Sequence, residues 1–178
     1  MHVEAGTVLH FSEDPGISRF VPHVAATAAD RTPYVWAVDA HRAPDYWFPR
    51  QCPRAMAWVE PATTDHDRSA ILGPGAERVH MIEYSWLPQM QAVRLFAYRF
   101  DAALFEPYGE DRTSHAHVAR RPVIPLGPPE PVPDLLTLYE EAGIELRLAR
   151  LIWPWWRAVT ASTVGFSGIR LKNARAGS

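Results

Sequence analysis

A chain of 178 residues, 47% of them hydrophobic and 21% charged, is long enough for one globular domain with a sizeable core. Its net charge of -2 excludes the broad basic field with which proteins attract nucleic acid or anionic membranes. A single cysteine, Cys52, excludes an internal disulfide and a cysteine-rich zinc site, and it favours a reducing compartment.

The beginning of the chain lacks the positive region and long apolar run of a signal peptide, and no apolar segment approaches the ~20 residues that span a bilayer. We therefore expect a cytoplasmic protein. The composition is rich in proline, with 17 residues, and in tryptophan, with 7. Because proline interrupts helices, these prolines predict short strands joined by rigid loops.

The first half of the chain contains apolar and aromatic runs typical of strands. The opening strand is expected over 7–9, and His10 and Ser12 follow it directly. The pattern predicts further strands over 34–38, 55–59, 78–84 and 93–100, the last two as a hairpin. Phe96, Tyr98 and Phe100 alternate with smaller or polar residues, so we expect an aromatic face in the core. Between the strands we expect a turn or short helix over 16–20, a short helix over 40–47 capped by Asp39, a polar loop over 61–75 and a turn over 87–90.

The second half is less regular. Leu135, Leu138, Tyr139 and Ala142 form one stripe that predicts a helix over 133–143, and Gly143 is a suitable C-terminal stop. We expect a long polar connection over 101–117, an edge strand over 117–126, a rigid linker over 127–131, and strands over 144–148 and 166–171. The tryptophan-rich segment 153–159 fits either a short helix or a loop. The sum is a strand-rich α+β fold with a few short helices, in one domain over residues 1–178.

The segment Leu9-His10-Phe11-Ser12 contains the first candidate functional pair. His10 and Ser12 lie two residues apart, so on a strand their side chains share a face and can line a cleft. The alternative is structural, with His10 bonded to a neighbouring carbonyl and Ser12 or Asp14 capping the next turn.

This segment resembles the His-x-Ser or His-x-Thr strand that opens ADP-ribosyltransferase domains of the diphtheria-toxin and rifampin-modifying type. The run Val35-Trp36-Ala37-Val38-Asp39, followed by Ala43 and Tyr46, similarly resembles the second element of that family. The layout of 94–98, 105–106 and 117–123 is similar to its closing strands. The resemblance spans about residues 7–126 and implies a split-sheet transferase core that binds NAD.

The resemblance also implies roles for individual residues. His10, with Ser12 beside it, would hold the nicotinamide-side ribose, and Trp36 and Tyr46 would clamp the nicotinamide ring. A carboxylate, either Glu83 or Glu106, would stabilise the positive charge on the ribose or position the acceptor. The pyrophosphate would pair with an arginine, for which Arg19, Arg42 and Arg50 are the candidates. Trp36 departs from the tyrosine usual in the family, and the catalytic acid has no clear counterpart.

The chain as a whole also resembles an uncharacterised bacterial family with a His-Phe-Ser-Glu-Asp-Pro opening and a Phe-Ser-Gly-Ile-Arg-Leu ending, which implies no activity. Two other classes of function stay open. A binding protein without catalysis could use the cluster Trp153-Pro154-Trp155-Trp156 as a ligand or partner surface, although such clusters usually fill a core. A metal-dependent hydrolase could use His115 and His117, or His66 between Asp65 and Asp67, but no His-Glu-x-x-His motif is present and we predict no metal site.

Overall fold

The structure is a computed structural model that describes residues 4–24, 31–108 and 116–177. Two compact units divide the chain: unit 1 comprises Met1–Arg50 and Arg94–Pro133, and unit 2 comprises Gln51–Val93 and Asp134–Ser178. The predicted strand-rich α+β class with short helices is confirmed. The single domain over residues 1–178 stays a prediction.

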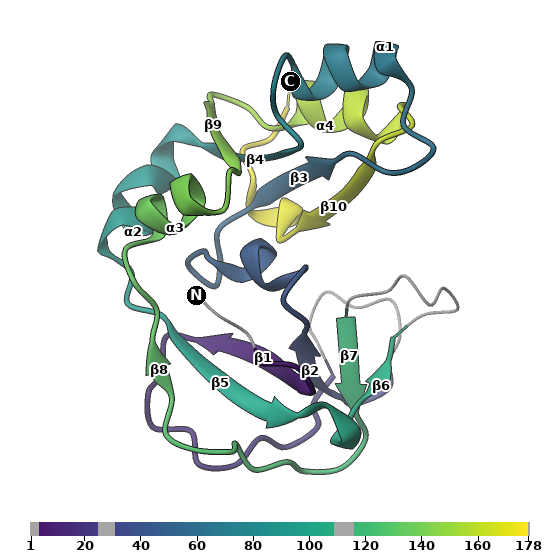
Figure 1. The fold of residues 1–178 in the computed structure, drawn as a ribbon. Coiled ribbons are helices and arrows are strands. Elements are labelled where there is room, and N and C mark those ends of the chain that lie inside the picture. Colours follow the sequence, from purple (N-terminus) through teal and green to yellow (C-terminus); the bar gives the residue numbers. More distant parts are fainter. Residues whose placement is uncertain (1–3, 25–30, 109–115, 178) are drawn as a thin grey trace. The chain divides into compact units, whose positions relative to one another are not determined.

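Unit 1 is built on an antiparallel sheet with the strand order β6-β7-β2-β1-β5-β8 (Figure 1). Its strands are β1 (Thr7–Ser12), β2 (Val35–Val38), β5 (Phe96–Asp101), β6 (Glu106–Pro107), β7 (Ala116–Ala119) and β8 (Glu130–Pro131). Strand β1 pairs with β5 along its whole length, from Thr7 opposite Asp101 to Ser12 opposite Phe96. This continuous register fixes which side chains of β1 face the core.

One face of the unit 1 sheet carries the core. Tyr98 and Phe100 are fully buried there, and Phe96 packs against the same cluster, so the predicted aromatic core face of this strand is confirmed. The remaining members of the cluster are Val8, Phe20, Val35, Ala37, Phe105, Ala119 and Val123. Burying each large apolar side chain stabilises the fold by about 1.5–3 kcal/mol, so this cluster holds β1, β2 and β5 together.

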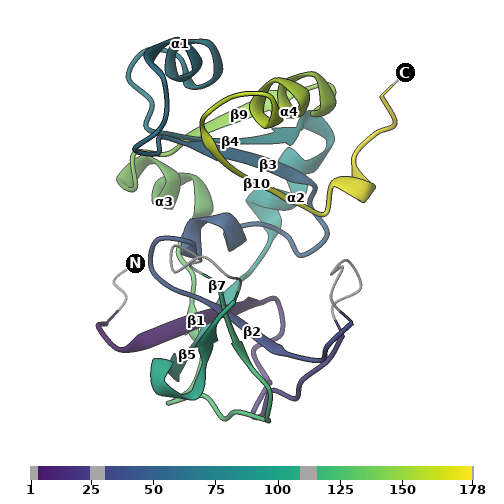
Figure 2. The same cartoon turned by 90° about the vertical axis from the view of Figure 1, so that its right-hand side faces the viewer.

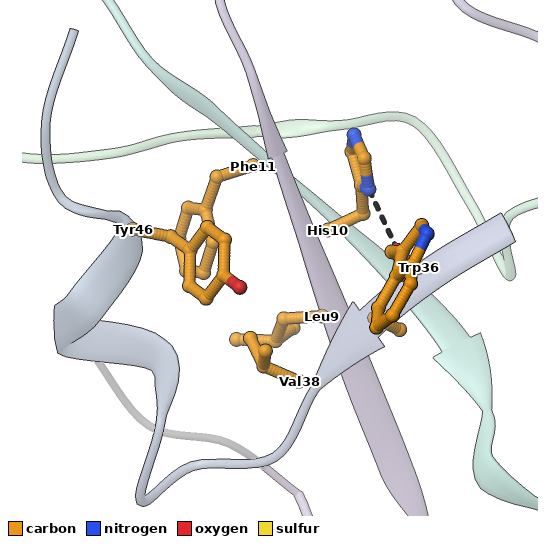
Figure 3. Close-up of a pocket in the computed structure, with 7 residues that line it drawn as sticks. Leu9, His10, Phe11, Trp36, Val38 and Tyr46 are labelled. Carbon is orange, nitrogen blue, oxygen red and sulfur yellow. Dashed lines mark hydrogen bonds between the residues drawn. The ribbon is translucent and has the colours of Figure 1, made fainter. Parts of the chain in front are cut away.

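The short helix after β2 is the 3-10 helix η1 (Ala43–Tyr46), shorter than the predicted 40–47. Asp39 lies before it as expected, and its Oδ1 accepts a hydrogen bond from the Arg42 N–H at 3.1 Å. Pro44 occupies the first turn, where its missing N–H leaves no hydrogen bond unmade. This local chemistry turns the chain after β2 and brings Tyr46 toward β1 (Figure 3).

Unit 2 is built on a four-stranded sheet with the order β10-β3-β4-β9, in which β4 and β9 are parallel and the other pairs antiparallel. Its strands are β3 (Arg54–Trp58), β4 (Arg78–Glu83), β9 (Glu145–Ala149) and β10 (Gly165–Ile169). Its helical segments are α1 (Asp65–Asp67), the π-helical η2 (Arg68–Leu72), η3 (Tyr84–Trp86), α2 (Leu87–Ala92), α3 (Leu135–Glu141), α4 (Trp153–Thr160) and η5 (Leu171–Asn173).

Helices cover both faces of the unit 2 sheet (Figure 2). Helix α4 packs its tryptophans on the face that contains Ala55 and Ala57, so the tryptophan-rich segment forms a helix that covers the core. On the other face, Tyr139 of α3 contacts His80 of β4. The predicted helix over 133–143 is confirmed: Asp134 accepts the Thr137 N–H at 2.9 Å, and Gly143 follows with a positive φ.

Five predictions about individual segments are wrong. The segments 78–84 and 93–100 form no hairpin, because β4 pairs with β3 and β9 in unit 2 while β5 pairs with β1 and β8 in unit 1. Pro88 in the first turn of α2 favours a helix between them. The loop 61–75 contains α1 and η2, which Thr64 caps and buried Leu72 anchors. In 122–126 Val123 makes one bridge, to Phe20, and residues 130–131 of the expected linker form β8.

Candidate functional site

A small cavity opens in unit 1 where β1, β2 and η1 meet (Figure 3). Its volume is about 280 Å³, including space open to solvent. The structure thus brings together three of the predicted site residues, His10, Trp36 and Tyr46. The complete lining is Leu9, His10, Phe11, Trp36, Ala37, Val38 and Tyr46. It is mostly apolar and aromatic, as is usual for small-molecule sites.

The strand register decides which side chains face this cavity. Leu9 lies opposite Val38 in the antiparallel pair of β1 and β2, and residues opposite each other share a face. Side chains alternate along a strand, so Phe11 and Trp36 share the face of Leu9 and Val38. The His10 side chain points to the other face, where its ring contacts Phe20 of the core cluster at 4.9 Å.

In Figure 3, Phe11 and Tyr46 lie side by side on one side of β1, and the His10 ring points away from them. His10 therefore contributes to the wall between the cavity and the core. Its Nδ1–H donates a hydrogen bond of 2.8 Å to the carbonyl oxygen of Trp36. This contact ties β1 to the residue that carries the largest ring of the cavity.

The environment of His10 favours its neutral form. Burial lowers the pKa of His10, and the charges of Arg50 and His23 lower it further, whereas the hydrogen bond to the Trp36 carbonyl raises it. A carbonyl oxygen can only accept, so Nδ1 carries the proton. In the neutral ring Nε2 is then a hydrogen-bond acceptor.

Ser12 lies on the core face with His10, as alternation predicts, but it does not line the cavity. Its side chain is buried, and its Oγ accepts the Asp14 N–H at 3.1 Å. Asp14 in turn accepts the Gly16 N–H at 2.7 Å. The structural role considered for Ser12 and Asp14, capping the turn after β1, is the one that the structure shows.

The two candidate carboxylates lie in different units. Glu83 ends β4 in unit 2, is 1% exposed, and accepts the Arg175 main-chain N–H with both oxygens. Glu106 is exposed on β6 in unit 1. It pairs with Val118, which pairs with Trp36, so Glu106 shares the face of Trp36 two strands away, about 9.5 Å at the usual strand spacing. Neither carboxylate lines the cavity.

The three candidate arginines have different surroundings. Arg42 forms an ion pair of 3.0 Å with buried Asp45 in η1, a contact that supports the helix beside the cavity. Arg50 is exposed, its main-chain N–H donates to Glu13 at 2.8 Å, and its charge acts on His10. Arg19 is exposed in the segment between β1 and β2. Of the three, Arg50 has the clearest connection to the cavity wall.

Two tyrosines outside the predicted site residues, Tyr34 and Tyr108, extend the aromatic face. Tyr34, Trp36 and Tyr108 contact one another edge to face, with ring centroids 4.5–5.8 Å apart. The Arg120 guanidinium lies 5.2 Å from the centre of the Tyr34 ring. Tyr34 is two residues before Trp36, so alternation placed it on this face. Tyr108 lies in the connection expected to be a polar loop, where no pattern indicated its position.

The residues considered for metal binding are dispersed. His115 lies outside the described residues, and His117 is in β7 of unit 1. His66 is in α1 of unit 2, where neighbouring Asp67 accepts hydrogen bonds from the Thr163 hydroxyl at 2.6 Å and its N–H at 2.8 Å. Across residues 4–24, 31–108 and 116–177, no three His, Cys, Asp or Glu side chains are grouped as metal ligands.

The described part of the chain contains no helix with the length and apolar character needed to cross a bilayer. Comparisons with curated proteins and with solved structures each gave no match. The model of one protein family, a family of unknown function, matches residues 9–174 and thus includes both the His-Phe-Ser segment of β1 and the C-terminal strand β10. This match confirms the expected membership of an uncharacterised domain family. The chain belongs to the family of unknown function DUF6886.

Proposed function

We propose that unit 1 binds a nucleotide such as NAD, with the planar nicotinamide ring in the cavity between β1, β2 and η1. The observation that supports this most is the position of Phe11, Trp36 and Tyr46 around one small opening. A flat ring gains from offset or edge contacts with aromatic side chains, each about 0.5–1.5 kcal/mol beyond the area buried, and the positive charge of the nicotinamide ring in NAD is attracted to their faces.

The size of the cavity limits what it holds. Its volume of about 280 Å³ includes space open to solvent, so the enclosed part is well below the roughly 300–1,000 Å³ typical of drug-sized ligand sites. A single ring with its carboxamide fits this space better than a whole dinucleotide. The ribose, pyrophosphate and adenosine would then extend outside it, where exposed Arg50 is a suitable partner for a phosphate.

His10 takes a positioning role in this proposal. The resemblance to ADP-ribosyltransferases gives the histidine a direct contact with the ribose, but the imidazole here faces the core side and bonds the Trp36 carbonyl. By fixing β2 against β1, His10 would hold the Trp36 ring at the angle the ligand needs. Its effect on binding would pass through Trp36.

ADP-ribosyl transfer is the reaction that the resemblance adds to binding. The bond between the nicotinamide nitrogen and C1 of the ribose breaks and neutral nicotinamide leaves, while the acceptor nucleophile bonds to that carbon and gives up its proton. A carboxylate lowers the cost of the positive charge on the sugar. Glu106 is the candidate for this role, because it shares a sheet face with Trp36. Ligand binding without catalysis is the second candidate function, favoured by a described lining that contains no carboxylate.

Thermal unfolding with three ligands tests the proposal. A ligand at ten times its Kd raises the free energy of unfolding by about 1.4 kcal/mol. NAD and nicotinamide should therefore raise the melting temperature, whereas ADP-ribose, which lacks the ring, should raise it less than NAD. The proposal fails if ADP-ribose stabilises as much as NAD or if none of the three has an effect. Release of nicotinamide from bound NAD would distinguish transfer or hydrolysis from binding alone.

A further inference from the structure

The C-terminal segment of unit 2 is attached to polar groups from distant parts of the same unit. We define residues 173–177, marked C in Figures 1 and 2, as the C-terminal strap. The chain redirects just before it at Arg170, where φ is 56°, the one positive φ at a non-glycine residue in the described part of the chain. Asn173 then donates through Nδ2 to the carbonyl and side-chain oxygens of Gln51, at 2.8 and 3.2 Å.

Two side chains bind the main chain of one strap residue, Arg175. The Glu83 carboxylate accepts the Arg175 N–H at 3.1 and 3.2 Å, and the Trp153 indole N–H donates to the Arg175 carbonyl at 2.7 Å. We call Glu83 and Trp153 the main-chain clamp. Arg175 is itself exposed, and the clamp forms hydrogen bonds with its main chain and not with its side chain.

The burial of Glu83 makes this contact important. A carboxylate that is 1% exposed is costly unless hydrogen bonds satisfy its oxygens. Within the described residues, both of its hydrogen bonds come from the Arg175 N–H. The strap contributes only small residues to apolar packing: Ala174 packs on the apolar cluster, and Gly177 lies against the Trp153 ring. At Arg175 the attachment is therefore made by the main chain, whereas Asn173 is held through its side chain.

We infer that the main-chain clamp is a binding site for an extended peptide, occupied in this structure by the chain's own strap, and that the strap is released and rebound as a unit. Release would uncover Glu83 and the segment around Gln51. The next residue, Cys52, is fully buried and is the only cysteine of the chain. The Glu83 charge acts on the Cys52 thiol, so this thiol lies close enough to the clamp to serve as a reporter of its opening.

A pair of full-length variants separates the main chain of Arg175 from its side chain. Arg175→Pro removes the N–H that Glu83 accepts, whereas Arg175→Ala keeps it and serves as the matched control. The preceding residue, Ala174, already has the extended conformation that a following proline requires, with φ -68° and ψ 153°. Trp153→Phe removes the other half of the clamp while it keeps an aromatic ring.

The measurement is the rate at which a thiol reagent labels Cys52 in the native protein, with a urea titration of each variant to verify the fold. Hydrogen bonds to charged groups are strong enough that loss of the N–H should speed labelling by about tenfold to a hundredfold. Arg175→Ala should label like the unaltered chain. Cys52 should be labelled faster in Trp153→Phe than in Arg175→Ala or the unaltered chain. If Arg175→Pro does not fold, the rate in Trp153→Phe is the test of the clamp.

A peptide of residues 171–178 tests binding in trans. Added to the Arg175→Pro protein, the natural sequence should return labelling of Cys52 to the slow rate, and the same peptide with proline at the Arg175 position should not. The inference is overturned if Arg175→Pro and Trp153→Phe both label no faster than Arg175→Ala. It is equally overturned if the natural peptide leaves the fast rate unchanged, since the strap would then be structural and the clamp no peptide site.

Discussion

The neutral His10 in the cavity wall makes stability depend on pH in a direction that the structure fixes. Burial, helped by the charges of Arg50 and His23, lowers the pKa of His10 in the folded chain, against about 6.5 in the unfolded chain. Between these two values the unfolded state binds more protons than the folded state. The free energy of unfolding contributed by His10 is therefore fully present above pH 6.5 and is lost as the pH falls below it.

The magnitude follows from linkage. One proton taken up on unfolding changes the free energy of unfolding by at most about 1.4 kcal/mol per pH unit. The test compares urea unfolding of the natural chain and His10→Asn from pH 7.5 to pH 5. Asparagine can donate its amide N–H to the Trp36 carbonyl but does not titrate in this range. Both chains contain the other histidines, so the contribution of these residues to the pH dependence cancels when one slope is subtracted from the other.

The natural chain should lose stability faster than His10→Asn below pH 6.5, even though the variant lacks the edge contact of the His10 ring with Phe20 and starts from a lower value. Because that lost contact does not depend on pH, it shifts the variant's curve without changing its slope. Equal slopes would show that His10 is not held neutral by its surroundings, and the assignment of the cavity wall would be wrong.

Three further predictions concern the two cores. Burial raises the pKa of Cys52 to about 12. Above about pH 8.5 the unfolded chain therefore loses the thiol proton while the folded chain keeps it. Urea titrations should show the free energy of unfolding falling as the pH rises through this range. A Cys52→Ala chain should lack that fall, and a natural chain without it contradicts the assignment. Asp134→Ala should destabilise unit 2 by about 1 kcal/mol through loss of the α3 cap, while Glu141→Ala should not. Tyr98→Phe should lower the free energy of unfolding, measured in urea, by about 1–3 kcal/mol, because the Ile17 N–H and the Asp14 carbonyl lose their hydrogen bonds to the buried hydroxyl. An unchanged free energy of unfolding would show that water replaces the hydroxyl.

Local pattern was sufficient to predict the strands whose residues are β-branched or aromatic, and the helix whose cap and stop are both explicit. Strand β5 and helix α3 illustrate this, because alternation buries Tyr98 and Phe100, and Asp134 begins the helix. The cavity residues Trp36 and Tyr46 were selected for their ring chemistry and a resemblance. The structure places both in one lining.

Pairing between distant segments was not predictable from these patterns. Strands β4 and β5 are neighbours in sequence but belong to different sheets, a choice made by packing with β3 and β1. The face of the His10 side chain depends on the register of β1 against β2, which the residues of β1 alone do not determine. Tyr108 contacts Trp36 only because β6 ends beside β7, a tertiary result without a local signal.

In the proposed site, the ring of Trp36 contacts the nicotinamide of NAD. Calorimetric titration of NAD into the natural chain, Trp36→Leu and Tyr108→Leu measures the contribution of this ring to binding. Tyr108→Leu is the control, because Tyr108 touches the Trp36 ring but is not part of the cavity lining. We expect Trp36→Leu to weaken NAD binding by about tenfold, the equivalent of about 1.4 kcal/mol of ring contact, and Tyr108→Leu to weaken it less. Binding of NAD that is unchanged in Trp36→Leu, or no binding by the natural chain, would contradict the proposed contact.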